Sequence, residues 1–450
     1  MITKVKQTFN HIPLYKILLG VTLLYFVIFS MSMVNLRGQP DQEPHNYFST
    51  RYAETWGIPE EDMQSNFVVT GQPYLYYWIN GAALKILGFF TPSERELNSF
   101  LILRIISVLY STITVYFLFR IVTKITGNPY AGVLGAFMLS NTLMFTFISG
   151  GISYDNLMNL TSMAAIYHLI SLFKNEDFIR HTGLMGTWLC LGAISKQQGL
   201  LLAALIFVVW LYYITRNHKN ISVTFKKKQI LIWLIFLISL GLFIGLYGVN
   251  LIQHHRLNPE CEEIKPANVC TRFTEREQYY SPLSIRWLWY SRNDNFNNPF
   301  QYAMSFWFIR ILHSIWGILS HEIFIPMLSV SLHGVLICWA VYCMIRYWQK
   351  EDRIQTMLLI VLLSYIAFIF FMNFKRDIEY DFMHYGIQGR YLFPVIGILY
   401  TLMIDYFLKI KVTFIKRLSL TLTIILYFVG GLGLFLVRYS EVFIHWRIYY

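Results

Sequence analysis

The sequence has few charged residues for its length. Asp, Glu, Lys and Arg make up 14% of its 450 residues, whereas a soluble protein averages about 25%. Hydrophobic residues make up 56%, and the mean hydropathy is +0.46. This balance excludes an ordinary soluble protein and predicts a polytopic membrane protein.

Signatures of several other classes are missing as well. No His/Cys cluster has the spacing of a zinc site, and no glycine-rich loop follows a strand pattern. Nothing therefore indicates ATP or a nucleotide-sugar donor. The formal net charge is +12, but basic residues gather in the cytoplasmic loops of membrane proteins, so we expect no nucleic-acid partner. The first apolar run, residues 12–34, is too long for a signal peptide and is expected to be an uncleaved anchor.

Hydrophobic runs long enough to cross a bilayer recur along the chain. We expect an all-α fold in one membrane domain, residues 1–450, with outer loops at 36–98 and 253–320. About eleven spans are predicted, at residues 13–35, 99–119, 130–148, 157–173, 183–195, 199–215, 229–251, 323–346, 355–373, 391–408 and 417–437.

The run at residues 73–90 is ambiguous by hydropathy alone, and the basic residues decide it. If it does not span and the N-terminus is cytoplasmic, every short cytoplasmic loop is basic, as the positive-inside rule requires. If it spans, that pattern fails. We therefore predict juxtamembrane helices in the first outer loop. The outer loops carry no Asn-x-Ser/Thr acceptor, which favours a bacterial inner membrane.

On this topology the first polar group follows the first span directly. Asp41, Glu43 and His45 lie in a short segment with the sequence PDQEPH. Carboxylates at a membrane surface can act as a general base on an acceptor hydroxyl or hold a divalent metal, although nothing requires a metal here. The alternative is a solvated polar linker.

Two further outer segments carry candidate residues. Asp155 follows a Gly-Gly turn and is a candidate catalytic acid, or simply the N-cap of the next helix. Lys196, beside Gln197, places a positive charge on the outer side, against the positive-inside tendency. Its charge suits a phosphate; the alternative is an interfacial lysine that reaches toward water.

The segment GIQGRYLFP opens a late span and carries Gln388, Arg390 and Tyr391. An arginine guanidinium matches the geometry of phosphate oxygens. Anchoring at the membrane interface is the alternative. In the long outer loop, Cys261 and Cys270 are close enough in sequence to form a disulfide in an oxidising compartment; two free thiols are the alternative.

These motifs, taken together, resemble the GT-C superfamily of polytopic glycosyltransferases. The resemblance covers most of the chain and depends on four segments in the family's order. They are PDQEPH with the return segment GQPYLYYW, GISYDN around Asp155, SKQQG around Lys196, and Gln388-Gly389-Arg390-Tyr391 with a following proline. The chain departs from the family's adjacent acidic pair because Gln42 separates Asp41 from Glu43, so either acid could be the base.

The resemblance implies sugar transfer from a polyprenyl phosphate to an extracytoplasmic acceptor. The acceptor would be a cell-envelope glycan, a lipid or a protein, and the sugar a hexose or pentose. Asp41 or Glu43 would act on the acceptor hydroxyl, and Asp155 would orient the reacting groups. The leaving phosphate and the sugar would contact His45, Lys196, Gln197, Gln388, Arg390 and Tyr391. A lipid-linked oligosaccharide flippase, or an O-antigen polymerase or ligase, is the alternative function.

Overall fold

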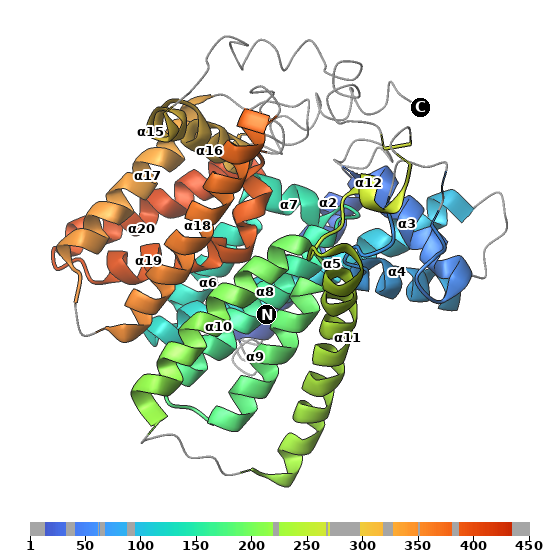
Figure 1. Ribbon diagram of the computed structural model, residues 1–450. Coiled ribbons are helices and arrows are strands. Elements are labelled where there is room, and N and C mark those ends of the chain that lie inside the picture. The colour runs from blue at the N-terminus through green and yellow to red at the C-terminus, as the bar shows by residue number, and fades with distance from the viewer. Residues whose placement is uncertain are drawn as a thin grey trace, which may run out of the picture.

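The computed structural model describes residues 14–32, 41–61, 63, 68–87, 95–218, 225–266, 269–270, 298–317, 327–349, 352–379 and 387–433. Within these ranges every regular element is a helix (Figure 1). The all-α fold expected from the sequence is therefore confirmed.

The helices up to the middle of the chain form the larger part of the bundle. They are α2 (Leu14–Ser32), α3 (Gln42–Thr55), α4 (Leu75–Ile86), α5 (Arg95–Thr126), α6 (Pro129–Ser140), α7 (Leu143–Ser149), α8 (Tyr154–Phe173), α9 (Phe178–Ala193), α10 (Gln197–Asn217), η2 (Lys227–Gln229), α11 (Ile230–His254) and α12 (Cys261–Ile264).

The remaining helices lie beside this group (Figure 1). They are α15 (Pro299–Tyr302), η3 (Ala303–Trp307), α16 (Phe308–Trp316), α17 (Met327–Arg346), α18 (Arg353–Glu379), η4 (Gly389–Leu392), α19 (Phe393–Leu408), α20 (Thr413–Phe428) and η5 (Val429–Gly433).

Seven of the described helices are long and apolar enough to cross a membrane. They are Ser99–Thr126, Gln197–Asn217, Lys227–His254, Met327–Arg346, Arg353–Ile378, Gly389–Leu408 and Thr413–Gly431. The count is eight if α6 and α7, which are bent by 75° to each other, form one broken span. The protein is therefore a multi-pass membrane protein.

The expected number of eleven spans is not confirmed. Three expected spans correspond to helices that do not qualify by length and composition. Of α2, only Leu14–Ile28 counts, as a shorter apolar helix. Helix α9 has 16 residues, and α8 carries polar side chains along its length. These α8 side chains are nevertheless buried, because other helices surround α8.

Helices α3 and α4 pack against each other in the first loop region, residues 41–87. Helix α4 has 12 residues, which at 1.5 Å per residue gives about 18 Å, well short of a bilayer core. Gly81 allows the two helices to approach closely, because a Cβ at this position would lie only 2.7 Å from the backbone nitrogen of Ala53. Helix α4 is accordingly not among the helices that qualify as spans, and its place at the membrane surface stays a prediction.

Helix α8 occupies the centre of the bundle and contacts α5, α9, α10 and α19. Several of its buried polar side chains are hydrogen-bonded inside the protein, as burial favours, whereas the Asn159 amide has no hydrogen-bond partner among the described residues. Asn156, for example, donates to the backbone oxygen of Ile148 at 2.8 Å and accepts from the Ser111 hydroxyl at 3.1 Å. The polar residues of α8 thus fix its rotation relative to its neighbours.

The corner between α9 and α10 is closed by a glycine. A Cβ on Gly199 would lie 2.2 Å from the backbone oxygen of Gly192 and 2.7 Å from the backbone nitrogen of Ala193. Backbone atoms cannot move aside as a flexible side chain can. This glycine allows α10 to begin directly against the end of α9.

We predict that Gly199→Ala destabilises the protein by about 1–3 kcal/mol, because the methyl group forces two packed helices apart. The thermal unfolding temperature in detergent measures this. Gly241→Ala in α11 is the control, since a Cβ there meets nothing within 4 Å. Equal unfolding temperatures for the two variants would contradict the prediction.

Candidate functional site

Three helices begin at the same place in the bundle, and each brings a charged residue there. Asp155 lies in the first turn of α8, Lys196 is the N-cap of α10, and Arg390 lies in η4, directly before α19. Their exposed fractions are 3%, 5% and 4%. Because a helix N-terminus carries a partial positive charge, three such ends together favour an anion.

The charged side chains form one network, the site cluster, made of Asp41, Asp155, Lys196 and Arg390. Asp155 Oδ1 pairs with Lys196 Nζ, and Asp155 Oδ2 lies 3.6 Å from Arg390 Nε. Arg390 Nη2 donates to Asp41 Oδ2 at 2.5 Å. Residues up to 349 positions apart in the sequence therefore meet, and two acids balance two cations.

Aromatic rings cover the cations of the site cluster. Lys196 Nζ lies 4.4 Å from the ring centroid of Tyr154 and 4.8 Å from that of Tyr391. The guanidinium carbon of Arg390 lies 5.8 Å from the Tyr391 centroid. A cation over an aromatic face is attracted by the ring quadrupole, more strongly where water is excluded. The rings thus shield the charges from solvent while stabilising them.

His45 joins the cluster from α3. Its Nδ1 is 2.9 Å from the Tyr77 hydroxyl, and its ring packs edge-on against Tyr154 at 4.5 Å. Burial lowers the pKa of His45 to about 4, an effect that Asp41 opposes and Arg390 reinforces. The imidazole is therefore neutral at pH 7. Its Nε2 is buried and has no hydrogen-bond partner within the described part of the chain.

The local backbone explains how Asp41 reaches Arg390. Asp41 is the N-cap of α3 and has a left-handed conformation, with φ of 62°, which Asp tolerates better than most residues. Its side chain is 48% exposed, so it lies at the open edge of the cluster. The next residue, Gln42, points inward and accepts from Arg104 Nε at 3.2 Å.

The turn that carries Arg390 is held by its neighbouring glycine. The backbone N–H of Gly389 donates to the Ser314 hydroxyl at 2.6 Å. A Cβ on Gly389 would lie 2.4 Å from Ile315 Cγ1 and 2.8 Å from its backbone nitrogen. Only glycine lets the turn rest on α16 at this distance, and this contact sets where Arg390 enters the cluster.

The structure brings most of the candidate residues together, but not all of them. Asp41, His45, Asp155, Lys196, Arg390 and Tyr391 lie in or against the cluster. Glu43 is exposed in the first turn of α3. Gln197 Nε2 donates away from the cluster, to Gln72 Oε1 at 3.2 Å. Gln388 caps η4, and its carbonyl accepts from Tyr391.

A family model described as "Predicted membrane protein (DUF2142)" matches residues 40–399. The chain belongs to this family. The match begins at the residue before Asp41 and includes the whole site cluster. No curated protein sequence matches the chain.

Two solved structures similar to this DUF2142 protein are of ArnT from Cupriavidus metallidurans. The structure bound to undecaprenyl phosphate has a TM-score of 0.51 at 12% identity, covering 88% of this chain and 60% of ArnT. The apo structure has a TM-score of 0.52 at 11% identity, covering 88% and 59%. The chain thus spans about 60% of the length of ArnT, and the two share the GT-C fold that the motifs indicated.

Sequence reasoning missed several residues around the cluster. Tyr154 contacts both Lys196 and His45, and the Ser153 hydroxyl lies 3.1 Å from Asp155 Oδ2. Both precede Asp155 in the same motif, which is the signal that could have found them. Tyr77 lies in the aromatic segment GQPYLYYW, where the sequence alone does not distinguish it from its neighbouring tyrosines. Arg104, inside an apolar span, had no such signal.

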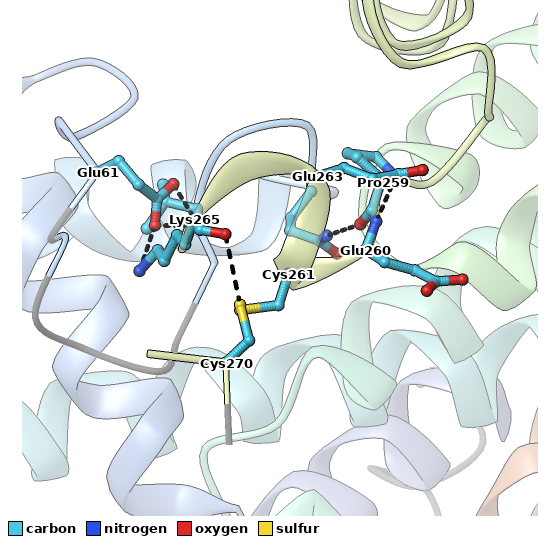
Figure 2. The surroundings of a disulfide bond; sticks show 9 residues. Glu61, Pro259, Glu260, Cys261, Glu263, Lys265 and Cys270 are labelled. Carbon is cyan, nitrogen blue, oxygen red and sulfur yellow. Dashed lines mark hydrogen bonds and ion pairs between the residues drawn. A yellow bond between two sulfur atoms is a disulfide. The ribbon is translucent and has the colours of Figure 1, made fainter. Parts of the chain in front are cut away.

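Cys261 and Cys270 form a disulfide in the second loop region, residues 255–317 (Figure 2). This is the pairing that the sequence led us to expect. For a metal, no group of three His, Cys, Asp or Glu side chains among the described residues could hold one. Both acids of the site cluster are instead paired with side-chain cations.

We predict that Asp155→Asn lowers the free energy of unfolding by about 3–5 kcal/mol, because it leaves two buried cations without the acid between them. Asn keeps the size of the side chain, so packing changes little. Denaturant or thermal unfolding in detergent measures the loss. Exposed Glu43→Gln is the matched control and should stay within about 0.5 kcal/mol of wild type; equal losses in both variants would disprove the prediction.

Proposed function

We propose that this protein is a membrane glycosyltransferase that moves a sugar from a polyprenyl phosphate to a hydroxyl of an extracytoplasmic acceptor. The observation that carries the proposal is the site cluster, in which two acids and two cations meet where three helices begin. The GT-C fold shared with an ArnT structure that holds undecaprenyl phosphate supports a lipid-phosphate donor.

The net charge of the site cluster changes during the proposed reaction in a way that stabilises the transition state. The site cluster is neutral before reaction, because Asp41 and Asp155 balance Lys196 and Arg390. As the acceptor oxygen bonds to the anomeric carbon, its proton passes to Asp41 and the bond from that carbon to the phosphate oxygen breaks. The cluster then carries one net positive charge while the leaving phosphate gains one negative charge. Fixed charges that match a developing charge stabilise the transition state.

Each residue then has a role. Asp41 is the base, since it is half-exposed at the edge of the cluster and contacts Arg390. Lys196 and Arg390 neutralise the leaving phosphate, and Asp155 holds both cations in position. His45 is neutral and offers a ring nitrogen to a sugar hydroxyl. Gln388 and Tyr391 complete the donor-binding surface, whereas Gln197 bonds to Gln72 instead. This assignment places Glu43 outside the chemistry and requires no divalent metal.

The distribution of basic residues supports the orientation. The helices that begin at the site cluster end among basic residues at the other end of the bundle, for example Lys174 after α8 and Arg216 in α10. The positive-inside rule then makes that end cytoplasmic. We place the cluster on the outer side of a bacterial inner membrane, with a cytoplasmic N-terminus, where a polyprenyl donor arrives laterally from the bilayer.

We predict that Asp41→Asn lowers kcat about 10²–10⁴-fold, the range lost with a general base, whereas Glu43→Gln keeps wild-type turnover. The assay follows a radiolabelled sugar from its lipid phosphate to product, which also separates a transferase from a flippase that releases none. Equal activity in Asp41→Asn, Lys196→Ala and wild type would refute the assignment. Transfer that persists in the presence of a chelator would support side-chain cations as the source of positive charge.

We predict that kcat/KM falls as the pH rises above about 8, which gives the pH profile an alkaline limb. Burial lowers the pKa of Lys196 to about 8, although Asp155 opposes that shift. Above this pH the side chain loses the charge that the phosphate needs. Lys196→Arg, which stays charged over the whole range, should have a lower kcat/KM at neutral pH but no limb there. A limb unchanged in Lys196→Arg would assign it to another group.

A further inference from the structure

A buried ion pair joins the two loop regions away from the site cluster. Lys265 follows α12 inside the loop closed by the Cys261–Cys270 disulfide, and its Nζ lies 2.8 Å from Glu61 Oε1 (Figure 2). The Lys265 side chain is 0% exposed and that of Glu61 is 12% exposed. Removing one partner of such a pair leaves an uncompensated buried charge, so the contact holds the two regions together.

Glu61 extends the contact into the first loop region. Its Oε2 accepts the backbone N–H groups of Val69 and Thr70 at 3.0 and 2.8 Å. Burial alone would raise the pKa of Glu61, but Lys265 and these N–H groups more than offset it, and the net shift is downward. Glu61 is therefore ionised at neutral pH, and it binds the segment at residues 69–70 to Lys265.

The residues that follow are packed against the end of α11. Gly71 has φ of 74°, and a Cβ there would lie 2.5 Å from Pro259 Cγ. Asn250 Nδ2 donates to the Gly71 carbonyl at 2.8 Å and to the Leu257 carbonyl at 2.9 Å. Gln72 Nε2 donates to the Pro259 carbonyl at 3.4 Å. The segment is thus fastened both to the end of α11 and to the second loop region.

The same segment then reaches the site cluster. Gln72 Oε1 accepts from Gln197, the residue after Lys196, and the N–H of Leu75 donates to the carbonyl of Ile194 at 3.0 Å. In the first turn of α4, the Tyr77 hydroxyl contacts His45. A continuous path therefore runs from Lys265 through Glu61 and residues 69–77 to both Lys196 and His45.

We propose that Lys265 and Glu61 are positioning residues, which hold residues 69–77 so that Lys196 and His45 stay in register with Asp41 and Asp155. The disulfide contributes by restricting the loop that presents Lys265, whose carbonyl also lies 4.0 Å from Cys270 Sγ. The part of the inference that concerns activity depends on the proposed function; the part that concerns geometry does not.

The first experiment needs no substrate. Hydrogen exchange is measured on the full chain in detergent for wild type, Lys265→Met, and the double variant Cys261→Ser/Cys270→Ser. Loss of one charge-assisted hydrogen bond in a buried site should raise exchange at the amides of Val69, Thr70 and Leu75 about tenfold or more in Lys265→Met. The double variant should show a smaller rise at the same amides.

The matched control is Arg256→Gln. Arg256 pairs with Glu260 and Glu263 in the same loop region, but its side chain is 52% exposed, and neither of these ion pairs reaches the first loop region. This variant should leave the three amides unchanged. Equal exchange in Lys265→Met and wild type, or an equal rise in Arg256→Gln, would overturn the proposal.

The second experiment separates positioning from a purely structural role. Lys265→Met should lower kcat/KM for the lipid-linked donor and move the alkaline limb assigned to Lys196 upward, because a looser Lys196 is less buried. The conservative variant Lys265→Arg, which keeps a positive charge beside Glu61 and leaves its hydrogen bonds to Val69 and Thr70 in place, should recover part of both effects. If Lys265→Met loses activity through unfolding alone, the limb keeps its position in the remaining activity, and the positioning role is rejected.

The two experiments fail independently. If the wild type transfers no sugar from any polyprenyl phosphate, the proposed function is wrong, while the exchange result still supports or rejects the link between Lys265 and residues 69–77. If transfer occurs and the exchange rates do not respond to Lys265→Met, the positioning role is wrong and the glycosyltransferase proposal stands.

Discussion

The contact between Asp155 and two buried cations is the constraint on which the site depends. Charges that are almost wholly removed from water are tolerated only when they are paired and hydrogen-bonded. Asp155 lies between Lys196 and Arg390, so α8, α10 and the turn before α19 must all begin at the same level of the bundle. The N-terminal ends of these helices then add their partial positive charge to the same place.

The bundle and the loop regions contribute different parts of the site. The bundle supplies both cations and the buried acid, each at the start of a helix. The first loop region supplies the half-exposed acid Asp41 and the neutral imidazole of His45, both on α3. Helix α3 packs against α4 and α5, and these contacts set its position. A complete site therefore requires parts of the chain that lie outside the membrane-spanning helices.

Glycines allow close packing where the helices that carry the two cations begin. Gly199 and Gly389 sit where two backbones approach each other, next to Lys196 and Arg390 respectively. In each case a glycine fixes the start of the helix that carries a cation. The aromatic rings of Tyr154 and Tyr391 then fill the space around these cations, so that the charges are shielded without a loss of attraction.

Hydropathy and short motifs are local properties, and they were enough to predict a helical membrane protein and to select the segments that meet at the site cluster. The sequence predicted more spans than the structure supports by length and composition. One of the expected spans, α8, carries polar residues that lower its hydropathy and that are buried among other helices. The sequence could not choose between Asp41 and Glu43, because that choice depends on the left-handed conformation of Asp41 and the position of Arg390, 349 residues away. The contact of Asp41 with the cations, the place of Tyr154 between Lys196 and His45, and the pairing of Lys265 with Glu61 emerge only in the folded protein, because they join residues with no local signal of their proximity.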